Sequence, residues 1–122
     1  MTNLQADFAP NDIHTALKNQ EFSVFYQPKV LSSDKCIYGA ESLVRWSHPE
    51  YGVIPAYRFI GLAEDCGAIV ELDQFVLHQT CRMLEDTNAA GKEISISVNL
   101  SPKTIETTDF VSIISSVVSN YQ

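Results

Sequence analysis

A short polar connection between two strand-like segments is the feature that most constrains the fold of this chain. Residues 22–31 and 36–46 are both rich in the aromatic and β-branched residues that favour strands. Only residues 32–35, with the sequence SSDK, separate the two segments, and they are typical of a turn. A connection this short predicts an antiparallel hairpin, because parallel strands need a much longer crossover.

The rest of the sequence predicts helices and one further strand. We expect a loop with Pro and Gly over 47–54, and a short helical turn at 101–102. Apolar residues and capping signals predict four helices, over 12–20, 55–66, 69–88 and 109–120. Residues 94–100 alternate strictly between large apolar and small polar side chains, as a strand does. A strand, two helices and another strand are the elements of a parallel α/β sheet.

Composition and charge limit the classes of function. The 122 residues are enough for one domain at most, and 45% of them are hydrophobic, as in a globular protein. The net charge of −7 argues against binding to DNA, RNA or anionic membranes. No apolar run approaches the roughly 20 residues of a membrane span, and the N-terminus lacks the pattern of a signal peptide. The expected location is cytoplasmic, although the parent protein could still be anchored in a membrane.

Several reactive or charged residues are expected to have ordinary structural roles. The cysteines, Cys36, Cys66 and Cys81, form no CxxC pair and are expected to be buried, reduced thiols. Glu64 and Asp65 are expected on a solvated helix face. The three histidines lack the spacing of a metal site, and no glycine-rich phosphate loop is present.

An acid and a base on the second strand are the first candidates for a functional site. Alternation places Glu41, Leu43 and Arg45 on one face of that strand. At about 3.3 Å per residue the two charges lie roughly 13 Å apart, too far to be simple ion-pair partners. Charges placed in a core without each other indicate a ligand or a metal between them.

Asn99 is the next candidate, because it stands at the C-terminal end of a strand, where α/β folds collect functional groups. Glu41 and Asn99 offer hard oxygen ligands, which suit Mg²⁺ or Mn²⁺ better than zinc. Arg45 could clamp a phosphate and Gln27 could hydrogen-bond the same ligand. Structural alternatives stay open: a carboxylate paired within the fold, an arginine extending to solvent, and amides that end a turn or a strand.

An ordered set of motifs gives these residues a context. Together they resemble the first half of EAL domains, over about residues 12–122. The matching segments are YQP at 26–28, ESLVRW at 41–46, HPE at 48–50, FI at 59–60, LAE at 62–64 and VNLS at 98–101.

The resemblance implies a fold and an activity. EAL domains are cyclic di-GMP phosphodiesterases that use Mg²⁺ or Mn²⁺ to open the cyclic dinucleotide to linear pGpG. They fold as a modified TIM (β/α)₈ barrel with an early antiparallel strand, so the fold class implied here is α/β, the N-terminal half of such a barrel. By position, Glu41 and Asn99 would be metal ligands, and Gln27, Leu43 and Arg45 would bind cyclic di-GMP. Ser42 stands where the signature usually has Ala; its side chain points away from Glu41, so we expect little effect.

Length is the larger departure from the family. A TIM barrel needs about 250 residues, and the family's later motifs, an ExTE-like segment, a DDFG segment and a catalytic lysine, are not found here. We therefore expect residues 1–122 to form a partial EAL domain with a flexible leader over 1–11. Such a chain is expected to be inactive alone and to self-associate across the missing half-barrel.

Three functional hypotheses follow. The chain is part of a phosphodiesterase whose parent is active and which could carry a diguanylate cyclase or sensory domain. Alternatively, it is a degenerate EAL module that binds cyclic di-GMP or a protein without catalysis. In the third hypothesis it is an unrelated α/β domain in which Glu41 and Arg45 are structural.

Overall fold

The computed structural model describes residues 8–33, 36–107 and 109–121. Its strands are β1 (Phe22–Val30), β2 (Ile37–His48), β3 (Gly52–Pro55) and β4 (Ser95–Ser97). Its helices are α1 (Pro10–Lys18), the 3₁₀ helix η1 (Ala56–Arg58), α2 (Ile60–Asp65), α3 (Ile69–Ala89), α4 (Pro102–Ile105) and α5 (Phe110–Ser119).

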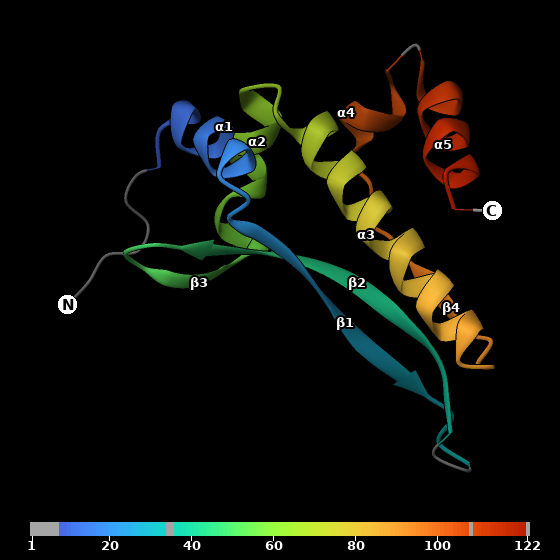
Figure 1. Cartoon of the computed structure of the whole chain (residues 1–122). Coiled ribbons are helices and arrows are strands. Elements are labelled where there is room, and N and C mark those ends of the chain that lie inside the picture. The colour runs from blue at the N-terminus through green and yellow to red at the C-terminus, as the bar shows by residue number, and fades with distance from the viewer. Residues whose placement is uncertain (1–7, 34–35, 108, 122) are drawn as a thin grey trace.

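The long strand β2 organises the sheet. It pairs with β1 in antiparallel register along most of its length, with Gln27 opposite Glu41. It also pairs with β3 antiparallel, and with β4 parallel, where Glu41 lies beside Ser97. The predicted hairpin and the predicted parallel crossover are therefore both confirmed, and Figure 1 shows the hairpin as a long twisted ribbon.

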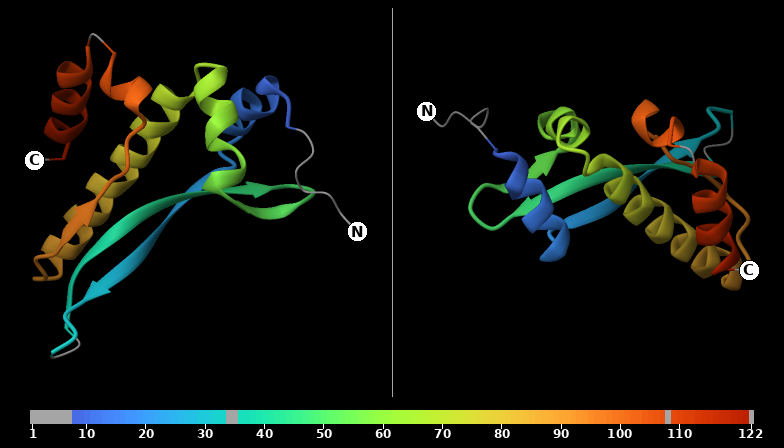
Figure 2. Two further views of the ribbon diagram at one scale, coloured as in Figure 1. Left: turned by 180° about the vertical axis from the view of Figure 1, so that it is seen from behind. Right: turned by 90° about the horizontal axis from the view of Figure 1, so that it is seen from above.

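The helices α1, α2 and α3 pack on one side of this ribbon and build the core (Figures 1 and 2). Trp46 and Phe59 are buried at the centre, with ring centroids 5.8 Å apart. Ile13 of α1 and Leu72 of α3 complete the same cluster. Each apolar side chain buried in this way contributes about 1.5–3 kcal/mol relative to exposure, so this layer holds the helices to β2.

Two segments differ from the sequence-based expectation. The expected loop over 47–54 contains β3, because Gly52 adopts a positive φ of 75° that reverses the chain and lets it pair with β2. The helix expected over 55–66 is divided into η1 and α2, because Pro55 is still paired with Arg45 as part of the sheet. The strand expected over 94–100 alternates as predicted, but only its first part pairs with β2.

Three further expectations concern the N-terminal leader, the cysteines and membrane-spanning segments. Most of the expected leader, residues 1–7, lies outside the described residues. Phe8 packs on Trp46, with ring centroids 4.7 Å apart, and α1 begins at Pro10. The expected burial of the cysteines is wrong, since Cys36 is exposed and the other two are only half-buried. Among the described helices, none has the length and apolar character needed to cross a membrane.

Gly39→Ala is expected to weaken the pairing of β2 with β4. A Cβ at Gly39 would lie 2.6 Å from the backbone oxygen of Ser95, which is closer than side-chain carbons approach backbone. Overpacking of this kind costs about 1–3 kcal/mol in the free energy of unfolding, measured by urea denaturation. The control is Gly61→Ala in α2, where a Cβ meets nothing within 4 Å; it should stabilise by about 0.5–1 kcal/mol. Equal stability of the two variants would contradict this account.

Candidate functional site

The face of the hairpin that points away from the helices carries the residues singled out in the sequence. Directly opposed residues of an antiparallel pair share a face, so Gln27 lies with Glu41, and Phe25 lies with Leu43. The other face of β2 is buried under the helices, with Ser42 at 3% and Trp46 at 1% exposure. The structure thus separates the candidate residues from the packing face.

Glu41 contacts Asn99, which comes from a distant part of the sequence. The Asn99 side chain donates from Nδ2 to Oε2 of Glu41 at 2.9 Å, across a separation of 58 residues. The parallel pairing of β4 explains the meeting, because Ser97 lies beside Glu41 and Asn99 follows it two residues later on the same face. Asn99 therefore uses its side chain across the sheet and not within the turn that follows it.

Arg45 has a different partner. Its guanidinium carbon lies 4.4 Å from the centre of the Phe25 ring, a cation–π contact. A pocket of about 280 Å³ opens here, and its lining includes Gln27, Leu43 and Arg45 together with Phe25 and Tyr26. The three residues expected to bind ligand thus line one cavity. Glu41 and Arg45 are half-buried on an accessible face, so the expectation that both lie enclosed in a core is wrong.

The fit of these residues to a divalent cation is partial. A carboxylate and an amide oxygen are suitable ligands for Mg²⁺ or Mn²⁺. As placed, Asn99 directs its nitrogen at Glu41, so the amide must turn over to present its oxygen to an ion. No group of three or more His, Cys, Asp or Glu side chains suited to a metal occurs within 8–33, 36–107 and 109–121. Among the described residues, two suitable ligands meet here, and an ion held by these two alone would be largely hydrated.

A buried acid beneath Asn99 was not predicted from the sequence. Asp73 of α3 is 5% exposed, and its Oδ2 accepts hydrogen bonds from the Ser101 backbone N–H at 3.0 Å and the Thr104 hydroxyl at 2.6 Å. Glu64, expected on a solvated face, instead accepts a hydrogen bond from the Ser101 hydroxyl at 2.6 Å. An acid four residues after the helix start at Ile69, between Leu72 and Gln74, gave no sign of this role. The serine and proline after Asn99 were the available signal, since they mark a helix start whose N–H groups need acceptors.

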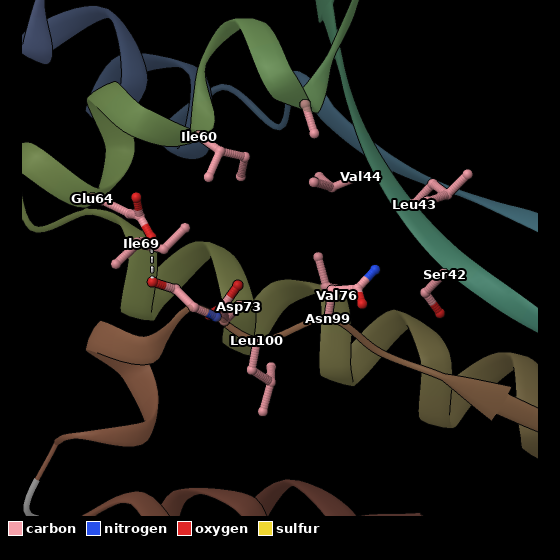
Figure 3. A pocket seen from close by; sticks show the side chains of 12 residues that line it. Ser42, Leu43, Val44, Ile60, Glu64, Ile69, Asp73, Val76, Asn99 and Leu100 are labelled. Carbon is pink, nitrogen blue, oxygen red and sulfur yellow. Dashed lines mark hydrogen bonds between the residues drawn. The ribbon is translucent and has the colours of Figure 1, made fainter.

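A second pocket lies between this network and β2. It measures about 230 Å³ and is bordered by Leu43, Glu64, Asp73 and Asn99 among other residues (Figure 3). Most of the remaining lining is apolar and comes from β2, α2 and α3. The segment that carries Asn99 is thus only loosely packed from beneath.

Burial raises the pKa of the Asp73 carboxyl above its usual value, and hydrogen bonds from Thr104 and Ser101 oppose the shift. The nearby Glu64 charge acts in the same direction as burial.

The stability of Asp73→Asn is expected to depend less on pH than that of the natural sequence. Because the folded pKa of Asp73 lies above the unfolded value of 3.8, the folded state favours the neutral acid. Its stabilising contribution is complete below the unfolded pKa and is lost as pH rises through the folded pKa. Urea denaturation from about pH 3 to about pH 7 should show the natural chain losing stability relative to the variant. A gain of relative stability over that range would contradict the prediction.

Sequence comparisons match the chain to a known family. The EAL domain family model matches residues 10–122. The chain is 38% identical over 92 residues to the bifunctional diguanylate cyclase/cyclic di-GMP phosphodiesterase MucR of Pseudomonas aeruginosa, covering 75% of this chain and 13% of that protein. It is 39% identical over 89 residues to the cyclic di-GMP phosphodiesterase NbdA of the same organism, covering 72% of this chain and 11% of that protein.

Solved structures of the same family match this chain. The phosphodiesterase PaMucR in complex with c-di-GMP matches with a TM-score of 0.86 and 32% identity, over 91% of this chain and 45% of that one. The EAL enzyme Bd1971, in its form bound to cAMP and cyclic di-GMP, matches with a TM-score of 0.82 and 28% identity, over 92% of this chain and 32% of that one. This chain thus spans less than half the length of each of these proteins. It belongs to the EAL domain family and folds as the first part of that family's modified TIM barrel, with the early antiparallel hairpin expected from the sequence.

Proposed function

We propose that this chain supplies the first part of the active site of a cyclic di-GMP phosphodiesterase. The observation that carries the proposal is the meeting of Glu41 and Asn99 at 2.9 Å beside a pocket lined by Gln27, Leu43 and Arg45. Support also comes from relatives named as cyclic di-GMP phosphodiesterases and from the similarity to PaMucR in complex with c-di-GMP.

Each residue of the pocket has a role that suits a cyclic dinucleotide. Arg45 is cationic and held over Phe25, so it is oriented to meet a phosphate with its donors. Gln27 provides amide hydrogen bonds, and Leu43 provides an apolar surface for a base or a ribose. The overall charge of −7 disfavours long nucleic acids but leaves room for a small phosphate ligand held by one placed cation.

Glu41 and Asn99 are the residues of this chain that would hold Mg²⁺ or Mn²⁺. Such an ion, when bound, polarises a phosphodiester oxygen and lowers the pKa of a coordinated water. Two protein ligands leave a divalent ion mostly hydrated, and a whole barrel needs about 250 residues. We therefore propose that residues 1–122 alone bind cyclic di-GMP weakly and do not hydrolyse it.

A second function, binding of cyclic di-GMP without catalysis, is favoured by the separation of the two sets of residues. The pocket that contains Arg45 does not include Glu41 or Asn99 in its lining. Ligand binding by that pocket could therefore persist without the metal pair. The name of MucR, a bifunctional cyclase and phosphodiesterase, supports a parent protein that also carries a diguanylate cyclase domain.

Arg45→Ala is expected to weaken binding of cyclic di-GMP by about 10-fold or more, because a charge-assisted hydrogen bond contributes about 1.5–3 kcal/mol. Isothermal titration of the 122-residue chain with Ca²⁺ present measures the affinity without turnover. The matched control is Arg82→Ala, which removes an exposed arginine of α3 that does not line this pocket. This variant should bind cyclic di-GMP as the natural sequence does.

Three outcomes decide between the hypotheses. Failure of the natural sequence to bind would contradict the proposal for this chain. Formation of pGpG with Mg²⁺ would contradict its inactivity. Binding that survives Glu41→Gln unchanged, with or without divalent ions, would favour the non-catalytic module.

We also propose self-association, here through the exposed end of the hairpin, where the sequence alone led us to expect it across the missing half-barrel. Four apolar residues, each about half exposed, gather at the end of the hairpin where β1 finishes and β2 begins: Val30, Leu31, Ile37 and Tyr38. Exposed apolar strands of this kind pair readily with a second copy. Light scattering at micromolar concentration should give a dimer or a larger species, and Ile37→Lys should shift it toward the monomer. Val111→Lys in α5, at a position 74% exposed, should leave the mass unchanged; a monodisperse monomer of the natural sequence would contradict the proposal.

A further inference from the structure

The segment that carries Asn99 is anchored by hydrogen bonds at the residues that follow it. The ladder between β2 and β4 ends at Ser97, so no strand pairing fixes the backbone of Asn99. Two residues further on, the Ser101 N–H donates to Asp73 Oδ2 at 3.0 Å. The Thr104 hydroxyl donates to the same oxygen at 2.6 Å. One carboxylate oxygen thus ties the segment after Asn99 to the buried side of α3.

Burial makes these bonds strong constraints. Asp73 is 5% exposed, Ser101 8% and Thr104 1%, so water competes poorly for their polar atoms. Leaving a buried donor or acceptor without a partner costs about 1–3 kcal/mol, more than the net gain from an ordinary exposed bond. The segment cannot move away from Asp73 without leaving the Ser101 N–H and the Thr104 hydroxyl without this acceptor.

Packing cannot replace these bonds at this place. The pocket of about 230 Å³ lies directly beside Asn99, Leu100 and Ser101, between them and β2 (Figure 3). A side chain next to a cavity lacks neighbours that would resist its movement. Asn99 itself is exposed, so its position depends on the backbone that carries it.

We propose that Asp73 is a positioning residue for Asn99. By accepting from Ser101 and Thr104 it fixes the backbone so that the Asn99 side chain lies opposite Glu41. The inference rests on the proposed function in one respect, that the Glu41–Asn99 pair holds a cation. The role requires an acceptor and not a charge, because both bonds end on a single oxygen, which the amide oxygen of Asn could replace.

The alternative is that Asp73 only stabilises α4. The structure offers a matched pair of substitutions to separate the two roles. Thr104→Val removes a buried hydroxyl bonded to Asp73, and Thr80→Val removes a buried hydroxyl of α3 bonded to Ser42 at 2.8 Å. The two threonines are 1% and 3% exposed, so both substitutions delete a buried hydroxyl with little change of shape. Thr80→Val removes at least as much hydrogen bonding as Thr104→Val, because the Thr80 hydroxyl also interacts with Tyr26. Only Thr104 belongs to the network that follows Asn99.

The test is nuclear magnetic resonance on the metal-free, isotopically labelled 122-residue chain. The readout is the nuclear Overhauser contact between the Asn99 side-chain amide and the Glu41 γ-methylene. We expect Thr104→Val to reduce this contact several-fold and Asp73→Ala to abolish it. Asp73→Asn, Thr104→Ser and Thr80→Val should retain it. The Ser101 amide shares its acceptor, Asp73, with the Thr104 hydroxyl. Loss of the Thr104 hydrogen bond should loosen that acceptor, so hydrogen exchange at the Ser101 amide should rise by about five-fold in Thr104→Val.

Loss of the contact in Thr80→Val as in Thr104→Val, its persistence in folded Thr104→Val, or its loss in Asp73→Asn would overturn the inference. A second titration with Mn²⁺ follows the paramagnetic broadening of the Asn99 amide, and the apparent dissociation constant should rise in Thr104→Val but not in Thr80→Val. If the natural sequence shows no broadening, the proposed metal site fails in this chain, while the metal-free contact still decides whether Asp73 positions Asn99.

Discussion

The parallel pairing of β2 with β4 is the contact on which the candidate site depends. It places Ser97 beside Glu41, and so brings Asn99 within 2.9 Å of the same carboxylate. The pairing needs the close approach of Gly39 to Ser95, where any side chain would meet backbone. Gly39 therefore acts at a distance from the site: it has no functional atoms, but it sets the separation of the two strands that carry Glu41 and Asn99.

Sequence patterns predicted which residues of β2 face the site, but they missed the residue that anchors the segment after Asn99. Alternation assigns Glu41, Leu43 and Arg45 to one face, because it follows from local geometry. The pairing that sets Gln27 opposite Glu41 depends on a register shift between Lys29 and Val30, which no sequence pattern indicated. The role of Asp73 has no such signature. Its partners are a backbone N–H and a hydroxyl about 30 residues away on a different element, and only the packing of α3 under the β4–α4 turn brings them together. Strand β3 escaped prediction for a related reason, because its pairing with β2 depends on a reversal at Gly52.

The helix α3 connects the core to the functional face through side chains buried in roughly its first half. Leu72 packs in the apolar cluster with α1 and α2, while the neighbouring Asp73 anchors the turn beyond Asn99. Thr80, two turns later, contacts Ser42 under the centre of β2. Because these contacts share one rigid helix, a shift of α3 relative to β2 would change the distance between Glu41 and Asn99, and mutations in the core are expected to reach the site by this route.

The same helix explains how the strand accommodates its departure from the family signature. A serine stands at position 42, where EAL domains usually have alanine, and the side chain is 3% exposed. A hydroxyl buried without a partner would cost about 1–3 kcal/mol, but Ser42 is hydrogen-bonded to Thr80 at 2.8 Å. The extra polar atom is therefore satisfied on the helix side of the sheet, on the face opposite to Glu41.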